Sequence, residues 1–212
     1  SGLTSFEINS GVLEKTGSFI FYGCKNLKEV KLNGVLKKIP KNMFADASYL
    51  EKVIIPKSVT SIDSMSFCEC NSLKSIVIPE NVTYIGYAAF KGCAQLKSVV
   101  VPAKVNEIKW CAFEDCTALT SVTVKNKNVK FGVQVFRNDN NLTIKCYKNS
   151  TAHKYALDNK IKCSPTLGNS SGNTVTANAV KGLKIGGRAS NALRLNWNSD
   201  SSVKGYVIEQ YR

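Results

Sequence analysis

The sequence has few of the residues on which enzymes rely for catalysis. It contains one histidine, His153, and it shows no Gly-x-Ser-x-Gly motif, no phosphate-cradling loop and no pair of carboxylates on one strand face. His153 is expected on the exposed side of a short helix, where a catalytic base would also need a nucleophile within reach. We therefore predict that the protein is not an enzyme, has no catalytic residues and needs no cofactor.

Long apolar segments are missing as well. No run of about 18 apolar residues occurs, which excludes a membrane-spanning helix. A signal peptide is not recognisable either. The chain begins with Ser1-Gly2 rather than with methionine, which suggests a processed or engineered start. The missing signal therefore says little about export.

What the sequence does contain is an internal repeat. Identical residue types recur every 23 residues and keep one phase over six units. The leucines of this set are Leu27, Leu50, Leu73, Leu96, Leu119 and Leu142, and the phenylalanines are Phe21, Phe44, Phe67, Phe90, Phe113 and Phe136. A period of this length predicts a solenoid, because each unit can bury its apolar face only by stacking on its neighbours.

One unit, Leu73 to Cys93, indicates how the chain coils. In SIVIP (residues 75–79) apolar and outward-facing side chains alternate, which predicts a short strand with its two isoleucines buried. The proline ends the strand because it lacks an N–H group. Gly86 then permits a tight corner, and Phe90 fills the interior of the coil.

This pattern resembles the BspA-like leucine-rich repeats, whose unit reads Leu-x-x-Val/Ile-x-Ile-Pro and then Val-x-x-Ile-Gly-x-x-Ala-Phe-x-x-Cys. Leu73 to Cys93 matches every named position, and the pattern covers about residues 3–163. The resemblance implies an α/β repeat fold, namely a right-handed leucine-rich-repeat solenoid of short strands, turns and short helical pieces. It also implies a bacterial protein of the cell surface or a secreted one, since BspA-like proteins are typical of gut and oral anaerobes and of some mucosal protozoa.

The end of the array predicts a cap. Residues 149–163 open with helix-capping residues, continue as a short helix and end in a strand at Lys160–Cys163. The helix is expected to place four residues on one face: Ala152, Tyr155, Ala156 and Leu157. Because a repeat array needs a terminal unit that shields its last rung, we expect the repeat domain to span residues 1–163.

The eight cysteines do not form the pattern of a disulfide framework. Four share one repeat position, where other units have alanine or aspartate: Cys24, Cys70, Cys93 and Cys116. They predict an interior ladder of small, free thiols. Cys146 and Cys163 end adjacent predicted strands and form the only plausible bridge. No metal site is predicted, because Cys68-x-Cys70 lacks a second cysteine pair.

Basic residues outnumber acidic ones, with 29 Lys and Arg against 15 Asp and Glu, and the formal net charge is +14. Such a surface favours anionic glycans, teichoic-acid-like wall polymers or acidic lipids, but it also serves solubility alone. Nucleic acid is not predicted as a partner, because no binding motif occurs and the lysines are spread along the array.

Two surfaces are candidates for ligand binding. The first is the outward face of the predicted strands, the face with which leucine-rich repeat proteins usually recognise partners. Its candidate residues are Lys31, Lys52, Ser75, Val77, Ser98, Val100, Ser121 and Thr123. The alternative is that the valines on this face are simply strand-forming residues.

The second surface is aromatic. Tyr87 and Trp110 hold the same repeat position, which places them on adjacent rungs, and Tyr84 lies one turn away. Neighbouring exposed aromatic side chains stack on sugar rings or anchor protein partners. The alternative is that they only shield the short second strand.

The composition changes after Cys163. Residues 164–179 are rich in Ser, Asn, Gly and Thr, which predicts a linker. Residues 180–212 contain three short alternating strands that resemble the first three strands of a fibronectin type III domain, with Trp197 ending the second. Because such a sandwich needs about seven strands, we expect this segment to be part of a longer protein. It is expected to be mobile, or to be ordered by packing on the repeats or by self-association through residues 180–212.

Together these features predict a non-enzymatic cell-surface recognition or adhesion protein whose repeats bind a protein, an anionic glycan or a wall polymer. The alternative is an intracellular or wall-associated structural scaffold. A binding module of a larger enzyme is a less favoured third possibility. An export signal or a wall anchor elsewhere in the full-length protein would distinguish the first two.

Overall fold

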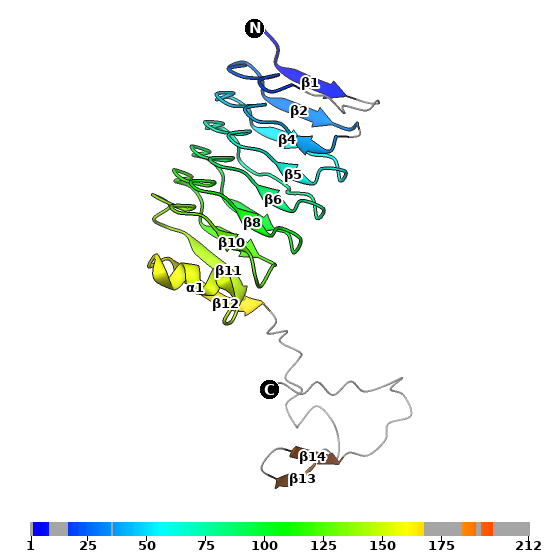
Figure 1. The fold of residues 1–212 in the computed structure, drawn as a ribbon, viewed down its shortest axis with the longest axis vertical. Helices are drawn as coiled ribbons and strands as arrows, with labels where there is room; N and C mark the ends of the chain where they lie inside the picture. The colour runs from blue at the N-terminus through cyan, green and yellow to red at the C-terminus, as the bar shows by residue number, and fades with distance from the viewer. Residues whose placement is uncertain (1, 9–16, 35, 168–183, 190–191, 197–212) are drawn as a thin grey trace. The chain divides into compact units, whose positions relative to one another are not determined.

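The computed structural model describes residues 2–8, 17–34, 36–167, 184–189 and 192–196. The chain divides into two compact units, Ser1–Gly168 and Asn169–Arg212. The first unit is a stack of coils that follow one another along a single axis (Figure 1).

Each coil of the first unit contributes strands to parallel ladders that run along the stack. The longer strands are β1 (Ser5–Ile8), β2 (Glu29–Leu32), β4 (Lys52–Ile54), β7 (Ser98–Val101), β9 (Ser121–Val124), β11 (Thr143–Tyr147) and β12 (Lys162–Leu167). The two-residue strands are β3 (Lys38–Ile39), β5 (Ser61–Ile62), β6 (Tyr84–Ile85), β8 (Glu107–Ile108) and β10 (Lys130–Phe131). Most partners in register are 23 residues apart, as Ser98 is from Ser121, so the predicted solenoid is confirmed.

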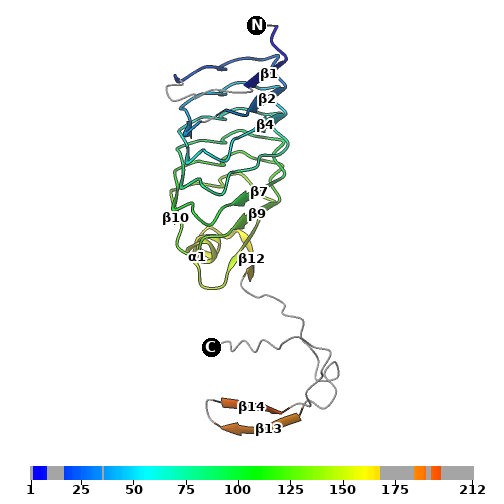
Figure 2. The ribbon, with the colours of Figure 1, turned by 90° about the vertical axis from the view of Figure 1, so that its right-hand side faces the viewer.

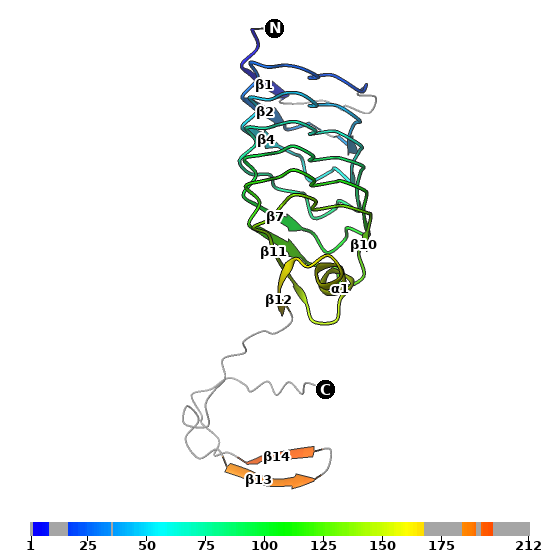
Figure 3. The same ribbon diagram turned by 90° about the vertical axis from the view of Figure 1, so that its left-hand side faces the viewer.

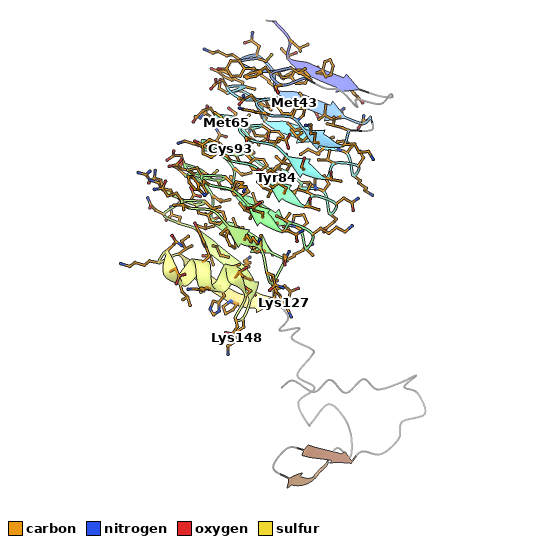
Figure 4. All side chains as sticks on the ribbon, viewed as in Figure 1. Met43, Met65, Tyr84, Cys93, Lys127 and Lys148 are labelled. Atoms are coloured by element: carbon orange, nitrogen blue, oxygen red, sulfur yellow. The ribbon has the colours of Figure 1, made fainter. Side chains whose placement is uncertain are left out.

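Stacked side chains fill the inside of the coils. The repeating leucines are buried, and the rings of adjacent ladder phenylalanines are stacked, with centroids 5.0–5.5 Å apart. Met43 and Cys93, labelled in Figure 4, belong to the same buried interior. The two residue types that carry the sequence repeat therefore form the core of the stack.

The ladder of longer strands is interrupted at residues 75–78. Side chains alternate there as predicted, with Ile76 and Ile78 buried and Val77 exposed. The segment nevertheless forms no strand, and no backbone hydrogen bond among the described residues joins it to β4 or β7. The ladder is thus split into one sheet of β1, β2 and β4 and another of β7, β9, β11 and β12. The prediction of a strand is wrong here. Alternating apolar residues in the sequence predict which side chains are buried, and these side chains stay buried although the backbone does not pair.

Beyond each corner that follows a short strand, alternate N–H groups, such as those of Ala88, Phe90 and Gly92, donate to carbonyls of the next coil, and we call these backbone hydrogen bonds the corner ladder. Phe90 N, for example, donates to Ala112 O of the next coil at 2.8 Å. The bonds of this ladder all run from an N–H of one coil to a carbonyl of the following coil. A Cβ at Gly86 would lie 2.5 Å from the backbone N of Ser64. The predicted tight corner is therefore a close approach between neighbouring coils.

Helix α1 (Thr151–Asp158) and strand β12 close the end of the stack (Figures 2 and 3). The Ser150 hydroxyl caps the helix by accepting a hydrogen bond from His153 N at 3.2 Å. The His153 side chain is half-buried rather than fully exposed, because its Nδ1 accepts a hydrogen bond from Asn149 N at 3.1 Å. The predicted cap and its capping residues are confirmed.

The cap differs from its prediction in two places. Ala152 and Ala156 are buried and Tyr155 is half-buried, whereas Leu157 is 60% exposed. The placement of Leu157 on the same face is wrong, because each helical residue turns by about 100° and carries Leu157 off the buried stripe. Strand β12 also runs to Leu167 and so includes residues 164–167 of the predicted linker.

All eight cysteines are free thiols. Three buried members of the cysteine ladder each donate to a backbone carbonyl 26 residues earlier, at 3.1–3.2 Å: Cys70, Cys93 and Cys116. Cys146 and Cys163 lie on adjacent strands as expected, but the register places Cys163 opposite Ile144 and no bridge forms.

In the second unit the structure describes β13 (Lys184–Ala189) and β14 (Ala192–Asn196), which pair in antiparallel fashion. They overlap the first two of the three strands predicted for residues 180–212. The third of these strands, and residues 168–179 of the predicted linker, lie outside the described residues. The fibronectin type III resemblance and the self-association of this segment stay predictions.

Candidate binding surfaces

The outward face of the longer strands carries an aliphatic stripe. Ile54, Val77 and Val100 hold one repeat position, and they are 39%, 80% and 45% exposed. We call these three residues the aliphatic stripe. Of the small residues predicted on this face, Ser75 and Ser98 are exposed, whereas Ser121 and Thr123 are half-buried.

The two lysines predicted on this face are already paired. Lys31 Nζ lies 3.5 Å from a carboxylate oxygen of Glu7, and Lys52 Nζ lies 3.0 Å from one of Glu29. Such surface pairs contribute little to stability, but each carboxylate compensates the charge of its lysine. This part of the face therefore presents aliphatic and small polar groups more than free positive charge.

The second surface follows the corners after the short strands. Tyr87, Trp110 and Val133 hold one repeat position on three successive coils, and they are 47%, 59% and 59% exposed. We call these three residues the aromatic stripe. The corner ladder fixes the spacing of their coils, because Ala88 N donates to Trp110 O at 3.0 Å and Cys111 N donates to Val133 O at 3.1 Å. The structure thus places Tyr87 and Trp110 on adjacent coils, as their spacing predicts.

Tyr84 occupies a different position from the other two predicted aromatics. It belongs to β6, where it lies in register between Ser61 of β5 and Glu107 of β8 (labelled in Figure 4). Its side chain is half-buried. Tyr84 is therefore part of the sheet that precedes the aromatic stripe and is not a member of the stripe.

A glycine supports the Trp110 side chain. A Cβ built on Gly132 would lie 2.5 Å from Trp110 Cδ1 and 2.5 Å from the Trp110 backbone N. No larger residue fits at this position unless the indole and its backbone move. Because the ring already rests on the neighbouring coil while remaining 59% exposed, binding a partner would cost it little side-chain entropy.

Charged side chains near the aromatic stripe are paired. Lys109 Nζ lies 2.8 Å from Glu107. Glu114 is buried and pairs with Lys91 at 2.7 Å and with Arg137 at 3.5 Å. The hydrogen bond to Glu114 raises the pKa of Lys91, which keeps this lysine charged. Since these charges compensate one another, the apolar rings determine what the surface can recognise.

Neither surface has the groups of a reactive centre in the part of the chain that the structure describes. No cluster of three His, Cys, Asp or Glu side chains there could hold a metal ion. Burial raises the pKa of Cys68 to about 11 and also raises that of Cys111, so neither forms a reactive thiolate at neutral pH. None of the described helices has the length and hydropathy needed to cross a bilayer.

Two members of the stripes, Ile54 and Val133, were not among the predicted binding residues. Both were within reach of the sequence pattern, because Ile54 lies one 23-residue step before Val77 and Val133 lies one step after Trp110. Their exposure could not be inferred from the repeat alone, since the position of Ile54 holds lysine or threonine in other coils and the position of Val133 holds lysine or serine.

A model of the BspA type leucine rich repeat region matches the chain in six copies, over residues 1–118 and 60–178. The chain belongs to this family. Membership confirms the resemblance carried by Leu73 to Cys93, and it indicates a repeat-based protein-binding role in a surface or secreted protein. Leucine-rich repeat proteins of this kind are typically non-enzymatic.

Solved structures share the fold of this BspA-type protein. The T. pallidum leucine rich repeat protein TpLRR is 25% identical with a TM-score of 0.61, and the match covers 78% of this chain and 87% of that one. A leucine rich cell surface protein from Faecalibacterium prausnitzii A2-165 is 33% identical with a TM-score of 0.59, over 70% of this chain and 40% of that one. The pneumococcal vaccine antigen PcpA has the same fold, with 24% identity and a TM-score of 0.57 over 74% of this chain and 41% of its own. No curated protein matches the chain.

Proposed function

We propose that this protein is a non-enzymatic cell-surface recognition protein that binds a partner protein through the aromatic stripe. The observation that carries the proposal is the exposure of Tyr87, Trp110 and Val133 on three successive coils, with the Trp110 indole supported by Gly132. Single exposed apolar residues are ordinary on protein surfaces, whereas a contiguous group of them marks an interaction site. Tryptophan and tyrosine are also the residues that most often dominate protein–protein binding energy.

The surroundings of the stripe favour a protein over a highly charged polymer. Lys109 and Lys91 are both paired with glutamates, at 2.8 and 2.7 Å. An apolar centre with a polar rim is the usual anatomy of a protein interface. An anionic glycan or wall polymer would instead be attracted by free lysines, and Lys31 and Lys52 on the strand face are paired as well.

Binding of the chain to an array of extracellular-matrix proteins and glycans, at two salt concentrations, tests this proposal. Trp110→Ala should weaken binding to the selected protein by about thirtyfold or more, because truncating a dominant interface residue costs about 2 kcal/mol or more. Tyr49→Ala is a matched control, since Tyr49 is also 59% exposed but lies outside the stripe. Equal losses in the two variants, or full binding by Trp110→Ala, would contradict the proposal.

The aliphatic stripe is a second candidate surface, and one observation favours it. Val77 is 80% exposed and lies in the segment whose described backbone is paired with neither β4 nor β7. If the partner binds there, Val77→Ser should weaken binding while Trp110→Ala should leave it unchanged. A steep loss of binding between low and physiological salt would indicate an anionic polymer instead.

A further inference from the structure

The corner ladder ends at the last coil with unused hydrogen-bond donors. In the preceding coil, the N–H groups of Cys111 and Asp115 donate to carbonyls of the next coil at 3.1 and 2.9 Å. The equivalent residues one repeat later are Gln134 and Asn138, and helix α1 follows them in place of another coil. Their N–H groups have no hydrogen-bond partner among the described residues.

Gln134 and Asn138 both line a cavity at the junction of the last coil and the cap. Its volume is about 690 Å³, within the range of roughly 300–1,000 Å³ that is usual for small-molecule sites. Asn140, Asn141 and Asn159 add side-chain amides to its walls. A side-chain amide offers both donors and an acceptor, which suits a ligand rich in hydroxyl groups. One donor of Asn159 is already used, because its Nδ2 donates to Tyr155 O at 2.8 Å.

The charged residues of the cavity are mainly basic. Arg137, Lys160 and Lys162 line it, and neither lysine has an ion-pair partner in the described part of the chain. Arg137 lies 3.5 Å from Glu114, but Lys91 already binds that carboxylate at 2.7 Å. The guanidinium therefore keeps N–H groups for another anion, and its planar fork matches a carboxylate or a phosphate.

Asp139 is the acidic residue among those that line the cavity, but both of its carboxyl oxygens are inaccessible to solvent and lie in the wall rather than in the open cavity. It is only 6% exposed, yet neither carboxyl oxygen has a hydrogen-bond partner among the described residues. Buried polar groups are nearly always hydrogen-bonded, so each exception needs an explanation. Burial raises the pKa of Asp139 to about 8, so at neutral pH the carboxyl is mostly protonated and repels an anion little.

We propose that this cavity binds an anionic polyol, meaning a hydroxyl-rich ligand that carries one carboxylate or phosphate. The anion would be held by Arg137, Lys160 and the free N–H groups of Gln134 and Asn138, and the amide side chains would bind the hydroxyls. Two sources supply this chemistry, sugar acids and polyol phosphates. The site shares no residue with either stripe, so it does not depend on the proposed protein partner.

Backbone-amide NMR of the whole chain, titrated separately with glucuronate, glycerol phosphate and glucose, tests the inference. At least one of the two anions should shift the amide signals of Gln134 and Asn138. It should leave the signal of Gly92 unchanged, because the Gly92 N–H already donates to Glu114 O at 2.9 Å. The anion that binds more tightly assigns the source as a sugar acid or a polyol phosphate. Absence of these shifts with both anions, or equal shifts with glucose, would overturn the proposal.

Affinities of charge variants for the tighter anion provide a second test. Lys160→Gln and Arg137→Gln should each weaken binding by about tenfold, which corresponds to the loss of one charge-assisted hydrogen bond. Lys57→Gln is the matched control, because Lys57 is exposed and does not line the cavity. An equal loss in this control would show non-specific attraction to a basic protein and would overturn the assignment of the site.

Discussion

Replacing Asp139 by asparagine should make the protein more stable at neutral pH and remove part of its pH dependence. Burial raises the pKa of Asp139 from an ordinary 3.8 to about 8 in the folded protein. Between these pH values the folded protein keeps a proton that the unfolded chain releases. The stability linked to this proton is therefore fully present below about pH 4 and is lost as the pH rises through about 8.

The size of the effect follows from the pKa difference. One pKa unit corresponds to about 1.4 kcal/mol, so the rise from 3.8 to about 8 sets an upper limit of about 6 kcal/mol over the whole range. Between pH 5 and pH 7.5 the limit is about 3 kcal/mol. Because a folded protein relaxes around a buried charge and screens it more than a rigid apolar interior would, we expect about half of this, or about 1.5 kcal/mol.

Urea unfolding at pH 5 and pH 7.5, at constant ionic strength, measures this difference. The wild-type protein should lose about 1.5 kcal/mol more than Asp139→Asn between the two pH values. The comparison cancels the contribution of every group that titrates in both proteins. Asp158→Asn is the control, because Asp158 is an exposed carboxylate on α1 that pairs with Lys154. Parallel pH dependence in wild type and Asp139→Asn would refute the reasoning.

Three further predictions concern the core and the support of the aromatic stripe. Phe90→Ala should destabilise the protein by about 3–5 kcal/mol, because rings stacked at 5.1 and 5.0 Å on either side cannot close the gap; an unchanged unfolding midpoint would count against the phenylalanine ladder as the core. Gly132→Ala should cost about 1–3 kcal/mol and shift the tryptophan fluorescence, since the new Cβ meets Trp110. Gly17→Ala, where no atom lies within 4 Å, should be neutral, and similar losses in the two variants would contradict this. The buried ladder thiols of Cys70, Cys93 and Cys116 should react with a thiol reagent slowly in native protein and fast in denaturant. Rapid labelling of the native protein would show that these thiols are not buried.

Features that depend on the repeat could be predicted from the sequence. The 23-residue phase predicts which side chains stack, so the burial of Phe90 and the adjacency of Tyr87 and Trp110 followed from spacing alone. Features that depend on how one coil approaches the next could not. The backbone at residues 75–78 keeps its alternating burial but not its pairing, and no local pattern distinguishes the two.

In the candidate sites, too, repeat spacing predicts where a residue lies but not which groups of the next coil it contacts. Spacing places Lys31 on the outward face, but it does not reveal that Glu7 compensates its charge. Gly132 holds the repeat position of the corner glycine Gly86, two 23-residue steps later, whereas its contact with Trp110 depends on the distance between two coils. The cavity at the capped end was missed altogether, although an aspartate at a position otherwise occupied by cysteine or alanine was the available signal.

The end of the stack explains why such an aspartate matters. Every bond of the corner ladder runs from an N–H to a carbonyl of the next coil, so the last coil must leave N–H groups without partners unless the cap supplies acceptors. Helix α1 supplies one, because Tyr155 Oη accepts a hydrogen bond from Val135 N at 3.1 Å. The neighbouring donors of Gln134 and Asn138 stay open beside a carboxyl that costs stability at neutral pH. Asp139 thus lowers stability at the point where the fold exposes N–H donors and basic side chains. A residue that lowers stability is expected at a binding site, here one for an anion.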